Sequence, residues 1–254
     1  MVLPLAFLAG AMLGCEDAAA HSASSAALAR SELTSTRAEP PSVPRSEPPA
    51  IELDRRPDGA LLAGTPLPTR PNADPERVLV LQATGAEPGL GGARVVDARF
   101  LGSGVVTLGV DHVLRLHRQG EVTVLDTGAY EPLSVSGTLV AYVRGAPPSL
   151  EVALADGATG TRTQLTEQLA PCWSPTISPD GAAIVFVSGA SGSPRLYRVE
   201  PGGAPRLLAQ VKRFPSAPVE PRFEDGLYVF DDELGTAWVD SHTGRVVRAT
   251  ERAR

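Results

Sequence analysis

The segment Ala170–Leu208, APCWSPTISPDGAAIVFVSGASGSPRLYRVEPGGAPRLL, contains a complete four-stranded unit in sequence form. Pro179-Asp180-Gly181 predicts a tight turn, because proline presets φ while Asp and Gly tolerate positive φ. The apolar, β-branched run Ala182–Val187 after the turn predicts a buried strand. Arg195–Glu200 alternates like a half-buried strand, and the hairpin Pro201-Gly202-Gly203 leads to an outer strand. The segment therefore predicts four consecutive antiparallel strands.

The same pattern occurs four times in the second part of the chain. In each copy an apolar residue precedes a glycine by three or four positions, and the glycine opens an apolar strand. The copies are ARFLGSGVVTL (98–108), EPLSVSGTLVAY (131–142), TISPDGAAIVFVS (176–188) and EPRFEDGLYVF (220–230), the last with the turn Asp225-Gly226. The glycines at 104, 137, 181 and 226 are 33, 44 and 45 residues apart. Propeller blades, including WD40-like ones, repeat at about 40–45 residues.

Cys172–Leu208 resembles the TolB-type β-propeller repeat, whose hallmark is a Trp-Ser-Pro-Asp-Gly run before an apolar strand. Here Trp173-Ser174-Pro175 and Ser178-Pro179-Asp180-Gly181 carry the hallmark in two parts. In the two earlier copies Ser103 and Ser136 replace the aspartate. The resemblance implies a periplasmic or surface-facing scaffold that binds protein partners, and it transfers no catalytic residue. We expect an all-β fold, a small propeller of about four blades with four antiparallel strands each over residues 76–254. Arg77–Gln82 is either a strand that seals the ring or the remnant of a fifth blade.

The N-terminal segment predicts export. Val2–Leu13 is apolar but shorter than the roughly 20 residues of a membrane-spanning helix, and it suits the apolar region of a signal peptide over residues 1–14. Gly14-Cys15 resembles the lipobox of bacterial lipoproteins, which makes Cys15 the predicted lipidation site. The apolar run has no preceding Lys or Arg, which departs from that pattern. The alternative is an uncleaved or misassigned apolar leader.

Residues 15–75 are rich in Ala, Ser, Glu and Pro. Such a composition buries too little apolar surface to offset the entropy of ordering, so we expect a disordered linker behind the lipid anchor. Ile51–Leu53 and Leu61–Leu62 are the places where it could touch the folded domain.

Charge and motifs limit the function classes. The chain has 23 basic and 29 acidic residues, a formal net charge of −6, with no basic face, so no nucleic-acid partner is expected. No nucleophile elbow, zinc helix or Walker loop occurs. His112 and His117 are five residues apart, which places them on opposite faces of a regular strand. We expect no catalytic, cofactor-binding or metal-binding residues, while a small-molecule ligand stays undetermined.

The sequence thus predicts a cell-envelope lipoprotein whose propeller binds a protein partner, exposed in the periplasm or at the surface. Two alternatives remain: a hydrolase or lyase that uses the propeller channel, and a spacer or assembly module without a ligand of its own.

Overall fold

A computed structural model describes residues 49–67, 78–85, 90–210, 222–232 and 235–251. The predicted signal peptide and Cys15 lie outside these ranges. Every regular element within them is a β-strand, and they contain no helix long and apolar enough to cross a membrane. The strands are β1 (Ile51–Arg55), β2 (Leu61–Pro66), β3 (Leu79–Thr84), β4 (Arg94–Leu101), β5 (Gly104–Gly109), β6 (Val113–Arg118), β7 (Glu121–Thr127), β8 (Ala129–Ser136), β9 (Leu139–Ala146), β10 (Ser149–Asp156), β11 (Arg162–Gln164), β12 (Cys172–Ile177), β13 (Ile184–Ser188), β14 (Arg195–Val199), β15 (Arg206–Gln210), β16 (Arg222–Glu224), β17 (Leu227–Asp232), β18 (Gly235–Asp240) and β19 (Val246–Glu251).

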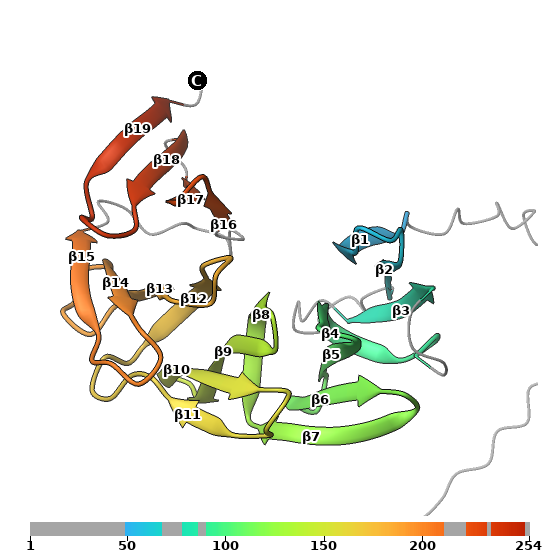
Figure 1. The fold of residues 1–254 in the computed structure, drawn as a ribbon. Helices are drawn as coiled ribbons and strands as arrows, with labels where there is room; N and C mark the ends of the chain where they lie inside the picture. The colour runs from blue at the N-terminus through green and yellow to red at the C-terminus, as the bar shows by residue number, and fades with distance from the viewer. Residues whose placement is uncertain (1–48, 68–77, 86–89, 211–221, 233–234, 252–254) are drawn as a thin grey trace, which may run out of the picture. The chain divides into compact units, whose positions relative to one another are not determined.

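The four predicted repeats are present as four antiparallel meanders (Figure 1). The first repeat is β4–β7, the second β8–β11, the third β12–β15 and the fourth β16–β19, each with its strands paired in chain order. This confirms the all-β fold class. Sequential meanders of this kind need only short hairpin connections, which is why turn residues punctuate the sequence so regularly.

The folded part begins before residue 76, which corrects the predicted domain boundary. β1 and β2 lie inside the predicted linker and pair with β3, and these three strands extend the first repeat into a seven-stranded sheet. Leu62 on β2 is completely buried and packs in one cluster with Leu79 and Leu81 of β3. Composition averaged over residues 15–75 concealed this short apolar strand, whose burial offsets the ordering entropy.

The core lies between successive sheets. Val106 and Leu116 of the first repeat pack in one cluster with Val140 and Ala153 of the second. Equivalent clusters join the second repeat to the third, the third to the fourth, and the strands β1–β3 to the first. The inward residues of each sheet thus bury those of the next, as in stacked sheets.

Side-chain acceptors add polar links between strands that are not neighbours in a ladder. The backbone N–H of Phe100 on β4 donates to Asp54 of β1 at 2.8 Å. Ile177 on β12 donates to the hydroxyl of Ser134 on β8 at 2.9 Å. Each link gives a partner to a backbone N–H, and a buried N–H without one would destabilise the fold.

The turn at Pro179-Asp180-Gly181 is wider than the sequence pattern predicts. Ala182 and Ala183, expected as the start of a strand, lie before β13, which begins at Ile184. Their N–H groups donate to side chains instead, Ala182 to Asp180 at 3.0 Å and Ala183 to Ser178 at 2.9 Å. Side chains that capture backbone donors compete with the ladder, which explains the later start of β13.

Candidate functional site

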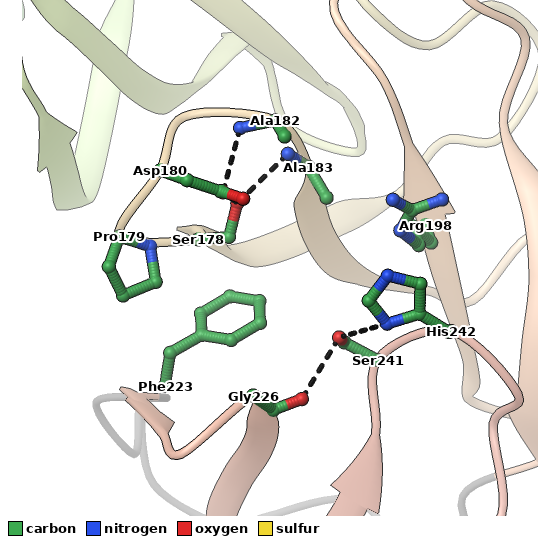
Figure 2. Close-up of a pocket in the computed structure, with 10 residues that line it drawn as sticks. All are labelled: Ser178, Pro179, Asp180, Ala182, Ala183, Arg198, Phe223, Gly226, Ser241 and His242. Carbon is green, nitrogen blue, oxygen red and sulfur yellow. Dashed lines mark hydrogen bonds between the residues drawn. The ribbon is translucent and has the colours of Figure 1, made fainter.

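A pocket of about 250 Å³ lies between the third and fourth repeats (Figure 2). The turn before β13 supplies one wall, and the two hairpin turns that flank β17 and β18 supply the other. Its lining residues are Ser178, Pro179, Asp180, Ala182, Ala183, Arg198, Phe223, Gly226, Ser241 and His242. A volume of this size accommodates a group of a few heavy atoms, below the usual range for drug-sized ligands.

The turn at Ser178–Ala183 forms a rigid wall. Ser178 donates its hydroxyl to the Asp180 carboxylate at 2.5 Å, and that same carboxylate oxygen accepts from Ala182. These two hydrogen bonds, the first being the larger cause, lower the pKa of Asp180. Gly181 has φ 72°, which favours glycine. Asp180 is therefore an anionic group whose Oδ1 already accepts two hydrogen bonds.

The opposite wall comes from the hairpin between β18 and β19. Asp240 accepts from the backbone N–H groups of His242 and Thr243 at 3.0 and 2.6 Å. Ser241 donates to the Gly226 carbonyl at 3.0 Å and lies 3.3 Å from His242 Nδ1. Since the Ser241 proton is directed at Gly226, its oxygen is an acceptor toward His242. The imidazole is thereby held at the pocket.

Arg198 on β14 provides the buried positive charge of the pocket. Only 6% of the residue is exposed. Its Nη1 donates to Glu200 at 2.6 Å, whereas its Nε has no hydrogen-bond partner among the described residues. Figure 2 shows the guanidinium group and the His242 ring on one side of the pocket, with Pro179 and Asp180 across it. A buried donor without a partner is destabilising unless an acceptor enters.

The strand ladders show which residues are equivalent to Arg198 in the other repeats. In each repeat, one residue pair closes the hairpin turn between the first and second strands. Two residues after the second-strand member of that pair, a second-strand residue pairs with a residue of the third strand. These third-strand residues are Leu116, Leu154, Arg198 and Trp238, opposite Val106, Ala141, Val185 and Val229. In the third repeat the closing pair is Ser178 with Ala183, joined by a backbone hydrogen bond of 2.7 Å. Arg198 thus stands where the other three repeats have a large apolar side chain.

The junction of the first and second repeats shows what fills this place elsewhere. Leu101 and Leu116 lie so close to Gly157 that a Cβ added there would meet their methyl carbons at 2.7 and 3.2 Å. Gly157 follows the aspartate of its hairpin, as Ser241 follows Asp240. The same three places between the third and fourth repeats hold Ser178, Arg198 and Ser241. Three places that make an apolar contact between the first and second repeats therefore line a polar pocket between the third and fourth.

The sequence-predicted residues reach this pocket only in part. Pro179, Asp180 and Gly226 line it. Gly181 and Asp225, the latter with φ 49°, shape the turns without lining it. His112, with φ 58°, occupies the turn between β5 and β6, and His117 Nε2 lies 2.9 Å from the Thr107 hydroxyl. Within the described ranges no group of three or more His, Cys, Asp or Glu side chains is arranged to hold a metal ion.

Sequence reasoning missed Arg198, Ser241 and His242. One signal was available for the last two, because the stretches Asp156-Gly-Ala-Thr-Gly160 and Asp240-Ser-His-Thr-Gly244 share the pattern Asp-x-x-Thr-Gly. Both aspartates accept hydrogen bonds from their own hairpin. Aligning the hairpins would have exposed Ser241 and His242 as the variable positions.

Comparisons with known proteins agree on the fold. No protein-family model and no curated protein sequence matches the chain. Among solved structures, a protein assigned as TolB from Agrobacterium tumefaciens is 16% identical with a TM-score of 0.50, covering 78% of each chain. A chain of the nidogen/laminin complex is 12% identical with a TM-score of 0.53, covering 80% of each chain.

A third structure, dipeptidyl peptidase 4 from Porphyromonas gingivalis, matches 76% of this chain and only 38% of its own, with 11% identity and a TM-score of 0.53. Identities this low establish architecture and not activity. The four meanders and these structural matches together show that the protein has a β-propeller fold, which is similar to that of the TolB structure.

Proposed function

We propose that the protein is an exported, lipid-anchored component of the cell envelope, in the periplasm or at the surface, whose propeller binds a protein partner. Short turns on rigid sheets are favourable places for recognition, because the scaffold fixes their geometry while their side chains vary. One structure with a similar fold was determined as the nidogen/laminin complex. This similarity supports a binding scaffold in general.

The pocket between the third and fourth repeats is the observation that carries the proposal. A repeat protein that serves only as a spacer has no reason to place a buried charge at a position that is apolar in its other repeats. Arg198, Ser241 and His242 depart from the repeat pattern together and around one cavity. Such a departure, which weakens packing, is typical of a functional site.

The N-terminal segment supports the envelope part of the proposal. The apolar stretch Val2–Leu13 followed by Gly14-Cys15 suits export and acylation of Cys15. A single acyl chain gives only marginal membrane binding, whereas two or more give stable anchoring. Residues 16–48 would then separate the folded part from the membrane surface.

Two measurements test the proposal in the native bacterium. Metabolic labelling with a palmitate analogue should mark the wild type and not the Cys15→Ala variant, with Cys172→Ala as the matched control that keeps its label. Crosslinking followed by affinity capture should recover the same specific protein from wild-type envelopes in every repeat, and less of it from Cys15→Ala cells. Absence of the label removes the lipid anchor from the proposal. Absence of any specific partner, with abundant folded protein, overturns the binding role.

A further inference from the structure

We propose that the pocket between the third and fourth repeats binds a carboxylate attached to a small apolar group, with Arg198 as the partner of the carboxylate. The inference rests on the proposed binding function and specifies the chemistry of what is bound. The ligand is a free acid or the terminal carboxylate of a peptide, since both present the same chemical group.

The guanidinium group of Arg198 requires a further acceptor. Its Nε has no hydrogen-bond partner within the described residues. Its ion-pair partner Glu200 has 62% of its side chain exposed, so water screens much of that negative charge. A planar guanidinium presents its donors as a fork that matches the two oxygens of a carboxylate. An entering carboxylate would satisfy Nε and pair with the buried charge.

The other polar groups of the pocket are compatible with an anion. Asp180 is the one carboxylate in the lining; its Oδ1 already accepts from Ser178 and Ala182. The Asp180 side chain is exposed, so solvent screens both its repulsion of an entering anion and its attraction to Arg198. His242 supplies a ring nitrogen on the same side of the pocket as Arg198 (Figure 2). Of the two charged side chains in the pocket, the buried one is therefore the positive Arg198, and the exposed one is the negative Asp180.

The remaining walls require the ligand to have an apolar part. Pro179, Ala183 and Phe223 present carbon atoms to the cavity. The Phe223 ring is itself held by an edge contact with Tyr228, with centroids 6.1 Å apart. Apolar walls around a few placed polar groups are the usual composition of ligand pockets. The cavity of about 250 Å³ suits one small side chain.

The fold can hold an apolar side chain at the place of Arg198. Leu116 and Leu154 occupy the equivalent places in the first two repeats, so the fold accepts an apolar side chain there. A buried ion pair is often no more stabilising than the apolar residues that could replace it. Binding of a carboxylate thus gives a reason for the charge at position 198.

The test is a titration of the full chain carrying Cys15→Ala with N-acetyl-leucine. Heteronuclear NMR and calorimetry measure the binding. N-acetyl-leucinamide, which lacks the charge, is the matched probe, and we expect it to bind at least about tenfold more weakly. A pentapeptide ending in leucine, with a free or an amidated C-terminus, distinguishes a chain end from a free acid. Binding of the pentapeptide assigns the site to chain ends, and binding of N-acetyl-leucine alone assigns it to small acids.

Variants assign the binding to Arg198. Arg198→Leu should weaken N-acetyl-leucine binding at least about tenfold, and Arg198→Lys by a smaller factor. Arg94→Leu removes the same charge from an exposed position on β4, in the first repeat, and should bind like the parent. Equal binding of acid and amide, unchanged binding in both Arg198 variants, or no binding of any probe to the folded protein at about 10 mM, a concentration suited to weak fragments, would overturn the inference. Partner capture that persists while the probes fail would leave the proposed function standing and refute this assignment alone.

Discussion

The carboxylate of Asp97 on β4 accepts a hydrogen bond of 2.9 Å from the backbone N–H of Leu133 on β8. Asp97 is 5% exposed, and its other oxygen lies 3.2 Å from the Arg99 guanidinium. One buried side chain therefore serves both its own strand and the neighbouring repeat. This polar contact adds to the apolar packing of Val96 and Leu101 with Leu133 at the same junction.

Asp97→Ala should destabilise the protein by about 1–3 kcal/mol, because it leaves the buried N–H of Leu133 without an acceptor. Urea unfolding at pH 7 measures the change in the free energy of unfolding. Glu121→Ala is the control, since Glu121 is an exposed residue at the start of β7 and its replacement should change stability by less than about 0.5 kcal/mol. Equal effects of the two substitutions would show that the link does not contribute.

Stability should depend on the ionisation of Asp126. Burial acts to raise the pKa of this carboxyl, but hydrogen bonds from Tyr142 and Thr127, together with Arg162 and Arg144, more than offset it, so the pKa is lowered. A lowered folded-state pKa means that the stabilisation is present above the unfolded value, near pH 4, and is lost as the pH falls below it.

Asp126→Asn should cost about 3 kcal/mol at pH 7, because two arginines lose their buried counter-ion. The same substitution should cost less at pH 3, because at that pH the unfolded chain already binds a proton at this carboxyl and the advantage of the folded state is smaller. Urea unfolding of both proteins at the two pH values measures this. An equal cost at pH 7 and pH 3 would contradict the role of the charge.

The turn before β13 should depend on glycine for its backbone angle. A Cβ at Gly181 would meet its nearest neighbour, a methyl carbon of Leu139, at 3.5 Å, which is ordinary contact. Gly181→Ala should therefore cost about 1–2 kcal/mol through positive φ alone, and Gly181→Asn less. Gly91→Ala, where φ is not positive and nothing lies within 4 Å, should be nearly neutral. Thermal unfolding measures all three, and a neutral Gly181→Ala would refute the strain.

Cys172 should be unreactive in the folded protein. Burial, followed by the charge of Glu151, raises the pKa of its thiol to about 12, and the residue is completely buried. Because the thiolate is the reactive species, a disulfide reagent at pH 8 should label Cys172 only as fast as the protein unfolds. Labelling of the Cys15→Ala variant in increasing urea measures this. Rapid labelling without urea would show an accessible thiol.

Arg198→Leu should leave the protein as stable as the wild type or stabilise it by about 1–4 kcal/mol, since it replaces a buried guanidinium group, whose partner Glu200 is largely exposed, by the side chain found in two other repeats. The free energy of unfolding from urea titration decides the sign. A loss of stability beyond about 1 kcal/mol, set against typical mutational effects, would assign Arg198 a structural role instead.

The sequence was sufficient for the repeats because turn chemistry and strand alternation are local properties. Asp225-Gly226 and Pro179-Asp180-Gly181 predicted hairpins, and these residues have the positive φ angles that such turns need at Gly181, Asp225 and Gly226. The start of β13 was two residues too early because side-chain acceptors within the turn took the first two donors. Pattern alone does not show which acceptor a backbone N–H will choose.

β1 and β2 escaped prediction for a different reason. Their apolar residues are few, and Leu62 becomes a core residue only through pairing with β3, which lies beyond a proline-rich stretch. The pocket was not predicted because Arg198 lies on a strand whose alternating sequence predicts half-burial, and an arginine is common on such a strand. Its meaning depends on comparison with Leu116 and Leu154, which requires the register of the ladders.

The junction of β3 and β4 has a mechanical consequence. β2 and β3 share six registered pairs, whereas β3 and β4 share only two, Leu79 with Val95 and Val80 with Arg94. A pulling force that enters the chain from its N-terminal side loads β1–β3 and their contacts with β4 before it reaches the later repeats. These three strands should therefore yield before the pocket, which is formed by the third and fourth repeats.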